Sequence, residues 1–141
     1  MAHVVADTSA LLAYFDASEP DHAAVVETIT AATDLLVVSP YVVAELDYLV
    51  ATRHGIDAEL AVLDELTGGA WELAGFGVDD LRHARSIVAS YRDQEIGVAD
   101  ASNVVLAERY RTRTIATLDR RHFDVLRSAT GDRFTVLPEV R

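Results

Sequence analysis

Short runs of apolar residues alternate along the chain with longer segments in which apolar residues recur every three or four positions. The first pattern is typical of buried strands and the second of amphipathic helices. The strand-like runs are residues 3–6, 35–38, 114–117 and 134–137, with a shorter one around Trp71. The helical segments are residues 8–15, a segment starting near Pro20, and residues 40–53, 57–66, 78–91 and 97–110. Strands that alternate with helices predict an α/β fold with a parallel sheet.

The pattern runs through the chain without a repeat, a low-complexity tract or a linker, and so predicts one domain spanning residues 1–141. Half of the residues are hydrophobic, which is enough to bury a core without disulfides. The absence of cysteine excludes thiolate metal sites and is typical of a reducing compartment. The N-terminus has no basic start, and no apolar run is long enough to cross a membrane. We therefore expect a cytoplasmic protein without a membrane segment.

Charge is distributed unevenly along the chain. Residues 1–105 hold 4 Arg and 18 acids, whereas residues 106–141 hold 8 Arg and 5 acids, a change from −14 to +3. The net charge of −11 argues against a large phosphate-binding surface, but the C-terminal quarter offers a local one. All twelve cations are Arg, whose guanidinium suits bidentate phosphate contacts. An ordinary solvated surface explains the same pattern equally well.

Two aspartates follow predicted strands. Asp7 comes directly after residues 3–6, and Asp119 follows residues 114–117 in a similar way. Ligands of open parallel sheets bind beyond the carboxyl ends of the strands, so both side chains lie where a site is expected. An aspartate before a helix is also an ordinary N-cap, and for either residue taken alone this structural explanation is the stronger one.

Two further acids lie within predicted helices. Glu45 shares an apolar stripe with Val42 and Leu49, and Asp100 lies on a similar stripe, so we expect both carboxylates to point inward. Burying an unpaired carboxylate costs several kcal/mol, so each acid needs a partner. A buried Arg is one option. The scarcity of Arg in the first half of the chain favours the other, a metal ion shared by all four acids.

The four acids predict a metal site made of oxygen ligands, with catalytic and metal-binding roles for Asp7, Glu45, Asp100 and Asp119. Oxygen ligation without cysteine favours Mg²⁺ or Mn²⁺ over zinc. One or two such ions support hydrolysis of a phosphodiester by activated water, without a histidine base. His122 can still contact a substrate phosphate, although a surface histidine in a turn is the more frequent case.

Four segments of the chain each contain one of these acids: VVADTSALLAYFD, SPYVVAELDYLV, GVADASNVVLAERY and TIATLDRRHF. Each segment is a weak signal by itself. Their order and spacing over essentially the whole chain make the combination specific. The sequence thereby resembles the PIN-domain family, and within it the VapC-like ribonuclease toxins of type II toxin-antitoxin systems.

The resemblance implies a single PIN-like domain with a sheet of about five parallel strands flanked by helices. It also implies a Mg²⁺-dependent (or Mn²⁺-dependent) endoribonuclease that cuts structured RNA such as a tRNA or rRNA loop, a homodimer, and a VapB-like antitoxin. Thr8 or Ser9 and Thr117 are expected to support the carboxylates by hydrogen bonds. Some relatives carry another acid one turn after the third carboxylate, and Asn103 at this position leaves the number of metal ions open.

The arginines near the fourth acid are the best candidates for binding RNA. The loop formed by Arg120, Arg121 and His122 is predicted to contact phosphates beside the pocket, because phosphate contacts position a nucleic acid. Arg109, Arg111 and Arg113 are expected nearby.

Two other functions fit parts of the pattern. A receiver or phosphotransfer domain also places aspartates at strand ends, but it needs a lysine near the phosphate, and this chain has none. A catalytically inactive PIN domain that binds RNA or another protein is the second alternative. The presence of all four acids argues against it.

Overall fold

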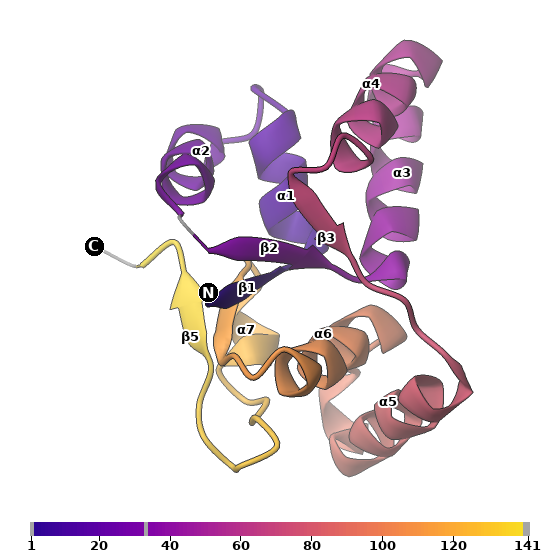
Figure 1. The fold of residues 1–141 in the computed structure, drawn as a ribbon, viewed down its shortest axis with the longest axis vertical. Helices are drawn as coiled ribbons and strands as arrows, with labels where there is room; N and C mark the ends of the chain where they lie inside the picture. Colours follow the sequence, from indigo (N-terminus) through magenta and orange to yellow (C-terminus); the bar gives the residue numbers. More distant parts are fainter. Residues whose placement is uncertain (1, 33, 140–141) are drawn as a thin grey trace.

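The computed structural model describes residues 2–32 and 34–139. Strands and helices alternate along the chain (Figure 1). The strands are β1 His3–Ala6, β2 Leu35–Val38, β3 Trp71–Leu73, β4 Thr114–Ala116 and β5 Thr135–Leu137. The helices are α1 Thr8–Phe15, α2 His22–Ala31, α3 Pro40–His54, α4 Ile56–Leu66, α5 Val78–Ser90, the 3-10 helix η1 Arg92–Gln94, α6 Val98–Arg109 and α7 Arg120–Phe123.

The five strands form one parallel sheet in the order β3-β2-β1-β4-β5. This arrangement confirms the predicted α/β fold and the expected number of strands. From β1 the chain builds outward to β2 and β3, then returns to place β4 on the other side of β1. The order of the strands therefore reverses between β1 and β4, where open parallel sheets form a ligand-binding crevice at the carboxyl ends of the strands.

Helices cover both faces of the sheet (Figure 1). Alternate residues of β1 point to opposite faces: Val4 and Ala6 join one buried cluster, and Val5 joins the other. The first cluster packs beneath α1–α4, and the second beneath α5, α6 and α7. Because both faces are covered, the strands are mostly apolar, as the sequence pattern indicates.

Most boundaries lie within two residues of those predicted from the sequence. The left-handed Gly55, with φ +88°, separates α3 from α4, as expected for a helix stop. One assignment was wrong: residues 120–123 form the short helix α7 rather than a loop. Its first turn is capped by Asp119, whose Oδ1 accepts a hydrogen bond of 3.4 Å from the backbone N–H of His122. No helix in the described ranges is long and apolar enough to cross a membrane.

Packing beneath α6 is predicted to dominate stability. Replacing the fully buried Leu106 with Ala should lower the free energy of unfolding by about 2–5 kcal/mol through lost burial and a residual cavity. Leu60→Ala is the control, because Leu60 on α4 is 52% exposed, and its cost should be about 1 kcal/mol or less. Urea unfolding followed by the fluorescence of Trp71 measures both values. Equal losses would contradict the assignment of the core.

Candidate metal centre

A cavity of about 580 Å³ lies at the carboxyl end of the sheet, next to the point where the strand order reverses. Asp7 reaches it from the end of β1, Glu45 from α3, Asp100 from the first turn of α6, and Asp119 from the segment after β4. The four acids singled out in the sequence therefore line one cavity. His122 completes this part of its wall.

Asp7 is the most buried of the four acids, with 5% of its surface exposed. It precedes the first residue of α1, the position of an N-cap, yet its side chain is committed elsewhere. Oδ2 accepts a hydrogen bond of 2.7 Å from the Thr117 hydroxyl, and Oδ1 accepts one of 3.1 Å from the Asn103 amide. Burial raises the pKa of Asp7; the Thr117 hydrogen bond opposes this shift, and the negative charges of Glu45 and Asp119 add to it.

Hydroxyl groups tie the cavity wall together. The Thr8 hydroxyl donates to Glu45 Oε1 over 2.7 Å, which links α1 to α3. Ser9 Oγ lies 3.1 Å from Thr117 Oγ1 and accepts a 2.9 Å hydrogen bond from the backbone N–H of Leu118, which links α1 to the end of β4. Thr117 Oγ1 also accepts from the backbone N–H of Asp119 at 3.0 Å. Thr8 and Thr117 thus donate directly to carboxylates, whereas Ser9 contacts Thr117 and a backbone N–H but no carboxylate.

Glu45 reaches the cavity in an unexpected way. The buried residues of α3 are Val42, Leu46 and Val50, and Glu45 lies beside this stripe rather than on it. Its side chain is exposed, so the prediction that Glu45 is buried among apolar residues is wrong. Glu45 lines the cavity from the solvent side, beside Tyr41. The prediction that Glu45 reaches the site from a helix is right, but the reason given for it, burial on the apolar stripe of that helix, does not apply.

Asp47 follows Glu45 by two residues and points away from it, toward α4. A hydrogen bond with Asp47 raises the pKa of Glu59 on α4, which shows that the two carboxyl groups are in contact. The residues of α3 that line the acidic cavity are Tyr41, Ala44, Glu45 and Leu49. Glu45 and Asp47 are therefore suited to a paired comparison, because Glu45 lines the acidic cavity whereas Asp47 lies against α4.

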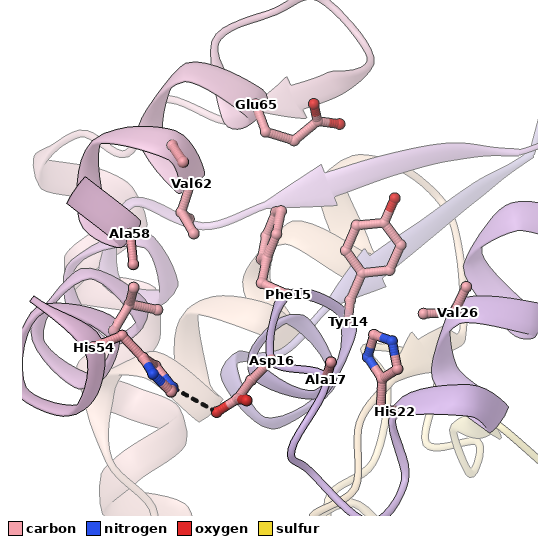
Figure 2. A pocket seen from close by; sticks show the side chains of 12 residues that line it. Tyr14, Phe15, Asp16, Ala17, His22, Val26, His54, Ala58, Val62 and Glu65 are labelled. Carbon is pink, nitrogen blue, oxygen red and sulfur yellow. Dashed lines mark hydrogen bonds and ion pairs between the residues drawn. The ribbon is translucent and has the colours of Figure 1, made fainter.

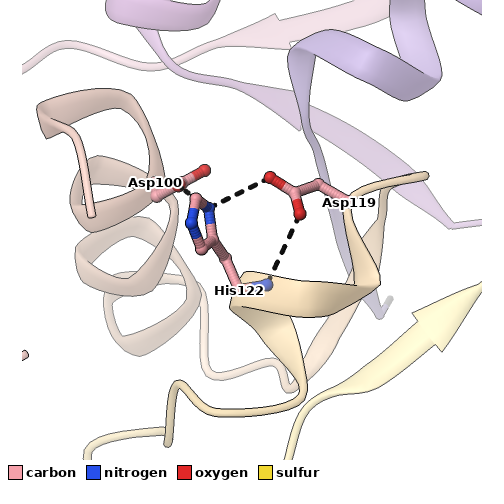
Figure 3. Close-up of side chains that lie close together, drawn as sticks. All are labelled: Asp100, Asp119 and His122. Atoms are coloured by element: carbon pink, nitrogen blue, oxygen red, sulfur yellow. Dashed lines mark hydrogen bonds and ion pairs between the residues drawn. The ribbon is translucent and has the colours of Figure 1, made fainter. Parts of the chain in front are cut away.

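Asp100, Asp119 and His122 form the tightest group in the cavity (Figure 3). Nδ1 of His122 lies 2.8 Å from Asp100 Oδ2 and 3.0 Å from Asp119 Oδ2. Burial is the largest influence on Asp100, followed by the charge of Asp7, and its pKa rises to about 6 although His122 acts in the opposite direction. Two protein groups thus have a raised pKa within one cavity, which is typical of functional sites.

The sequence did not indicate two of these contacts. The sequence marks Asn103 only as a residue that differs from the acid found in some relatives. In the structure Asn103 is fully buried and donates a hydrogen bond to the carboxylate of Asp7. From the sequence, His122 is expected to contact an RNA phosphate or to lie in a surface turn. In the structure its side chain is only 12% exposed and lies between Asp100 and Asp119. Its spacing of three residues from Asp119 was the available signal, because residues three apart share one face of a helix.

The arginines are less concentrated at the cavity than their sequence positions suggested. Arg120 lies beside Asp119 but donates a 2.6 Å hydrogen bond to the carbonyl of Pro138, while Arg121 is exposed. Arg109, Arg111 and Arg113 lie at the end of α6 and the start of β4. They are therefore at the amino ends of the strands, and the expectation that they lie near the pocket is wrong.

A larger cavity, of about 760 Å³, lies among α1, α2, α3 and α4 (Figure 2). Aromatic and aliphatic side chains such as Tyr14 and Phe15 form much of its lining. One of its two carboxylates, Asp16, is held by hydrogen bonds from Ser18 and by His54, whose Nε2 lies 2.8 Å from Oδ2. These contacts lower the pKa of Asp16 far below its usual range. The pKa of Asp16 is lowered by its partners, whereas burial raises the pKa of Asp7 and Asp100, so the candidate chemistry belongs to the smaller, acidic cavity.

The residues of the acidic cavity fit a divalent metal ion. Asp100, Asp119 and His122 each offer a ligand atom, and these atoms lie within 4.8 Å of one another. Asp7 is buried beside them with a raised pKa, which marks a negative charge in need of compensation. Most of the donors are carboxylate oxygens, the ligands that Mg²⁺ and Mn²⁺ prefer.

Comparisons with known proteins agree with this geometry. The chain is 70% identical over 135 residues to Ribonuclease VapC26 of Mycobacterium tuberculosis (strain ATCC 25618 / H37Rv), a match that covers 96% of this chain and 100% of that protein. The crystal structure of Mycobacterium tuberculosis VapC20, a Sarcin-Ricin loop cleaving toxin, is similar with a TM-score of 0.77 at 17% identity, over 82% of this chain and 89% of that one. VapBC2 from Rickettsia felis, bound to a DNA fragment from its promoter, gives a TM-score of 0.70 at 15% identity, over 95% of this chain and 98% of that one.

The match to a protein family covers most of the chain and includes all four acids. Residues 4–127 match the PIN domain family. The five-stranded parallel sheet, the acidic cavity at its carboxyl end and the 70% identity to a VapC ribonuclease lead to the same assignment. The chain belongs to the PIN-domain family.

Proposed function

We propose that this protein is a metal-dependent endoribonuclease and the toxin of a type II toxin-antitoxin system. The observation that carries the proposal is the convergence of Asp7, Glu45, Asp100 and Asp119 on one cavity. The 70% identity to a protein named Ribonuclease VapC26 supports the same activity. Hydrolysis of a phosphodiester by activated water is a reaction that such a carboxylate site supports.

The four carboxylates would hold Mg²⁺ or Mn²⁺ in the cavity. When bound, a divalent ion activates a water molecule for attack on phosphorus and stabilises the charge that develops on the phosphate oxygens. The protein keeps its ligands in place through hydrogen bonds: Thr117 and Asn103 orient Asp7, and Thr8 orients Glu45. Ligands that are fixed before the reaction need little reorganisation during it.

Structured RNA is the proposed substrate, a tRNA or rRNA loop. Arg121 is exposed next to the cavity, and its guanidinium lies 3.4 Å from Nε2 of His122. These two groups form a polar edge suited to an RNA phosphate. Arg120 is also part of the proposed RNA-binding surface. Its guanidinium donates to the carbonyl of Pro138, so its role there is to hold the C-terminal segment beside this edge.

A VapB-like antitoxin and a homodimer complete the proposal. The similarity in fold to VapBC2 and to another VapBC complex, from Salmonella typhimurium, supports a small protein partner. A cationic side chain of that partner, most simply an arginine, would neutralise the acidic cavity through charge-assisted hydrogen bonds. Large exposed apolar side chains offer surface for a second copy of the chain; they include Tyr48, Ile56, Leu60 and Val78.

The sharpest test of the active site compares Glu45 and Asp47. Glu45→Gln should lower cleavage of a labelled RNA hairpin by about 100-fold or more at fixed Mg²⁺, because it removes a metal ligand. Asp47→Asn should stay within about threefold of the wild type, because Asp47 contacts Glu59 on α4.

Asp7→Asn, Asp100→Asn and Asp119→Asn should behave like Glu45→Gln, with circular dichroism as the folding control. Equal effects at Glu45 and Asp47 would refute the site, and a wild-type chain that binds RNA without cutting it would favour an inactive PIN domain.

The stability of the metal-free protein should depend on Asp100. Its pKa is raised from 3.8 to about 6 in the folded state, so the stability that its proton contributes is present below about pH 4 and is lost as the pH rises through 6. At pH 7, Asp100→Asn should therefore melt roughly 3–8 °C above the wild type in EDTA, and the difference should disappear near pH 4. Asp79→Asn, whose carboxylate is 97% exposed, should leave the melting temperature unchanged. A wild type that is more stable than Asp100→Asn at pH 7 would count against the raised pKa.

The biological role is tested by expression. The wild-type chain should arrest growth when expressed alone, and the small protein encoded beside it should restore growth by covering the acidic cavity. Asp119→Asn serves as the matched control, because it removes a proposed metal ligand and should abolish toxicity. Growth measured after induction, with RNA integrity followed in parallel, gives the result. Harmless expression of the wild type at a high level would argue against a toxin.

A further inference from the structure

We propose that Nδ1 of His122 is a direct metal ligand, together with Asp100 and Asp119, and that the site therefore favours a first-row transition ion such as Mn²⁺ over Mg²⁺. The four-carboxylate site expected from the sequence becomes a mixed site of oxygen and nitrogen ligands. The inference rests on the proposed function to the extent that a divalent ion occupies the acidic cavity. It adds the identity of one ligand and the class of ion.

The distances around Nδ1 match those between ligands that share one ion. In an octahedral site, neighbouring ligands lie at right angles and each is about 2.1–2.2 Å from the ion, so they are separated by about 3.0 Å. Nδ1 lies 2.8 Å from Asp100 Oδ2 and 3.0 Å from Asp119 Oδ2. Both distances therefore suit neighbouring positions around one ion, and the three residues each offer a ligand atom within 4.8 Å of the others.

The orientation of the ring supports the same arrangement. Nδ1 is buried, and within the described residues it makes no hydrogen bond of standard geometry, although two acceptor oxygens are close. The oxygens therefore flank the nitrogen instead of lying along its axis. This is how the oxygen ligands of one ion surround a nitrogen ligand that points at the ion. A buried polar atom without a well-aligned partner is uncommon and requires an explanation such as an ion.

His122 is held in this position by its own element. It lies in α7, whose first turn begins at Asp119, and the carboxylate of Asp119 accepts the backbone N–H of His122. His122 follows Asp119 by three positions, so one turn of helix presents both side chains to the same point. Asp100 approaches that point from α6 on the other side (Figure 3).

The presence of Asn103 in place of an acid makes a nitrogen ligand useful on this side of the cavity. The amide of Asn103 donates to Oδ1 of Asp7 and Thr117 donates to Oδ2, and these hydrogen bonds fix the orientation of this carboxylate. Asn103 is neutral and adds no negative charge to the cavity. His122 supplies an additional donor near Asp100 and Asp119. Imidazole nitrogen binds transition ions more strongly than it binds Mg²⁺, which prefers oxygen ligands.

The test uses the full-length protein, freed of metal and loaded with MnCl₂. Pulsed electron paramagnetic resonance of the bound Mn²⁺ should detect the ¹⁴N nucleus of a coordinated imidazole in the wild type. The signal should disappear in His122→Gln and persist in His83→Gln, since His83 is on α5 and 44% exposed beside Glu108. In calorimetric titrations, His122→Gln should weaken Mn²⁺ binding by about tenfold or more but change Mg²⁺ binding by less than about threefold.

The outcomes separate this inference from the proposed function. Mn²⁺ that binds the wild type and supports RNA cleavage without ¹⁴N coupling would overturn the role of His122 and leave the nuclease intact. That result would make His122 a group that the ion displaces. Equal losses of Mn²⁺ and Mg²⁺ affinity in His122→Gln would also overturn it, because a merely structural role affects both ions alike. A wild type that binds neither ion would refute the inference and the metal-dependent function together.

Discussion

Negative charge at the carboxyl end of the sheet is the constraint on which the rest of the structure depends. Asp7 is held there by hydrogen bonds from Thr117, at the end of β4, and Asn103, in the middle of α6. These contacts join the end of β1 to two segments that lie 96 and 110 residues further along the chain. Glu45, Asp100 and Asp119 then lie within reach of the same cavity. The position of one buried carboxylate thus fixes where the other elements must meet.

A fold can tolerate this local repulsion when its stability comes from elsewhere. Two buried apolar clusters cover the two faces of the sheet, and together they contain most of the residues of the strands. The carboxylates lie outside these clusters, at an edge where β1 and β4 end. Burial without full compensation raises the pKa of Asp7 and Asp100 in the metal-free protein. Stability is therefore given up at this site, as the proposed binding of a cation would require.

The sequence predicts those features that depend on local pattern. Apolar runs locate the strands, and the rule that ligands bind at the carboxyl ends of parallel strands locates Asp7 and Asp119. Glu45 was assigned correctly to a helix that borders the cavity, but its exposure depends on how α3 is rotated against the sheet, which periodicity alone does not determine. The position of His122 depends on α7, a helix of four residues that is too short for a hydrophobic period to reveal. Asn103 could be recognised as unusual, but its bond to Asp7 is a contact between residues 96 positions apart.

The number of arginines in the C-terminal quarter overstates how much positive charge is free to bind a phosphate. The C-terminal quarter carries most of the arginines, yet several are used within the fold. Arg127 donates to the backbone carbonyls of residues 124–126, Arg109 pairs with Asp80, and Arg120 donates to Pro138 O. Few cations are left near the cavity of a protein whose net charge is −11. In the proposed function, a polyanionic RNA that enters this cavity meets mostly carboxylates, so a bound metal ion would have to neutralise the site before RNA binds as well as take part in the reaction.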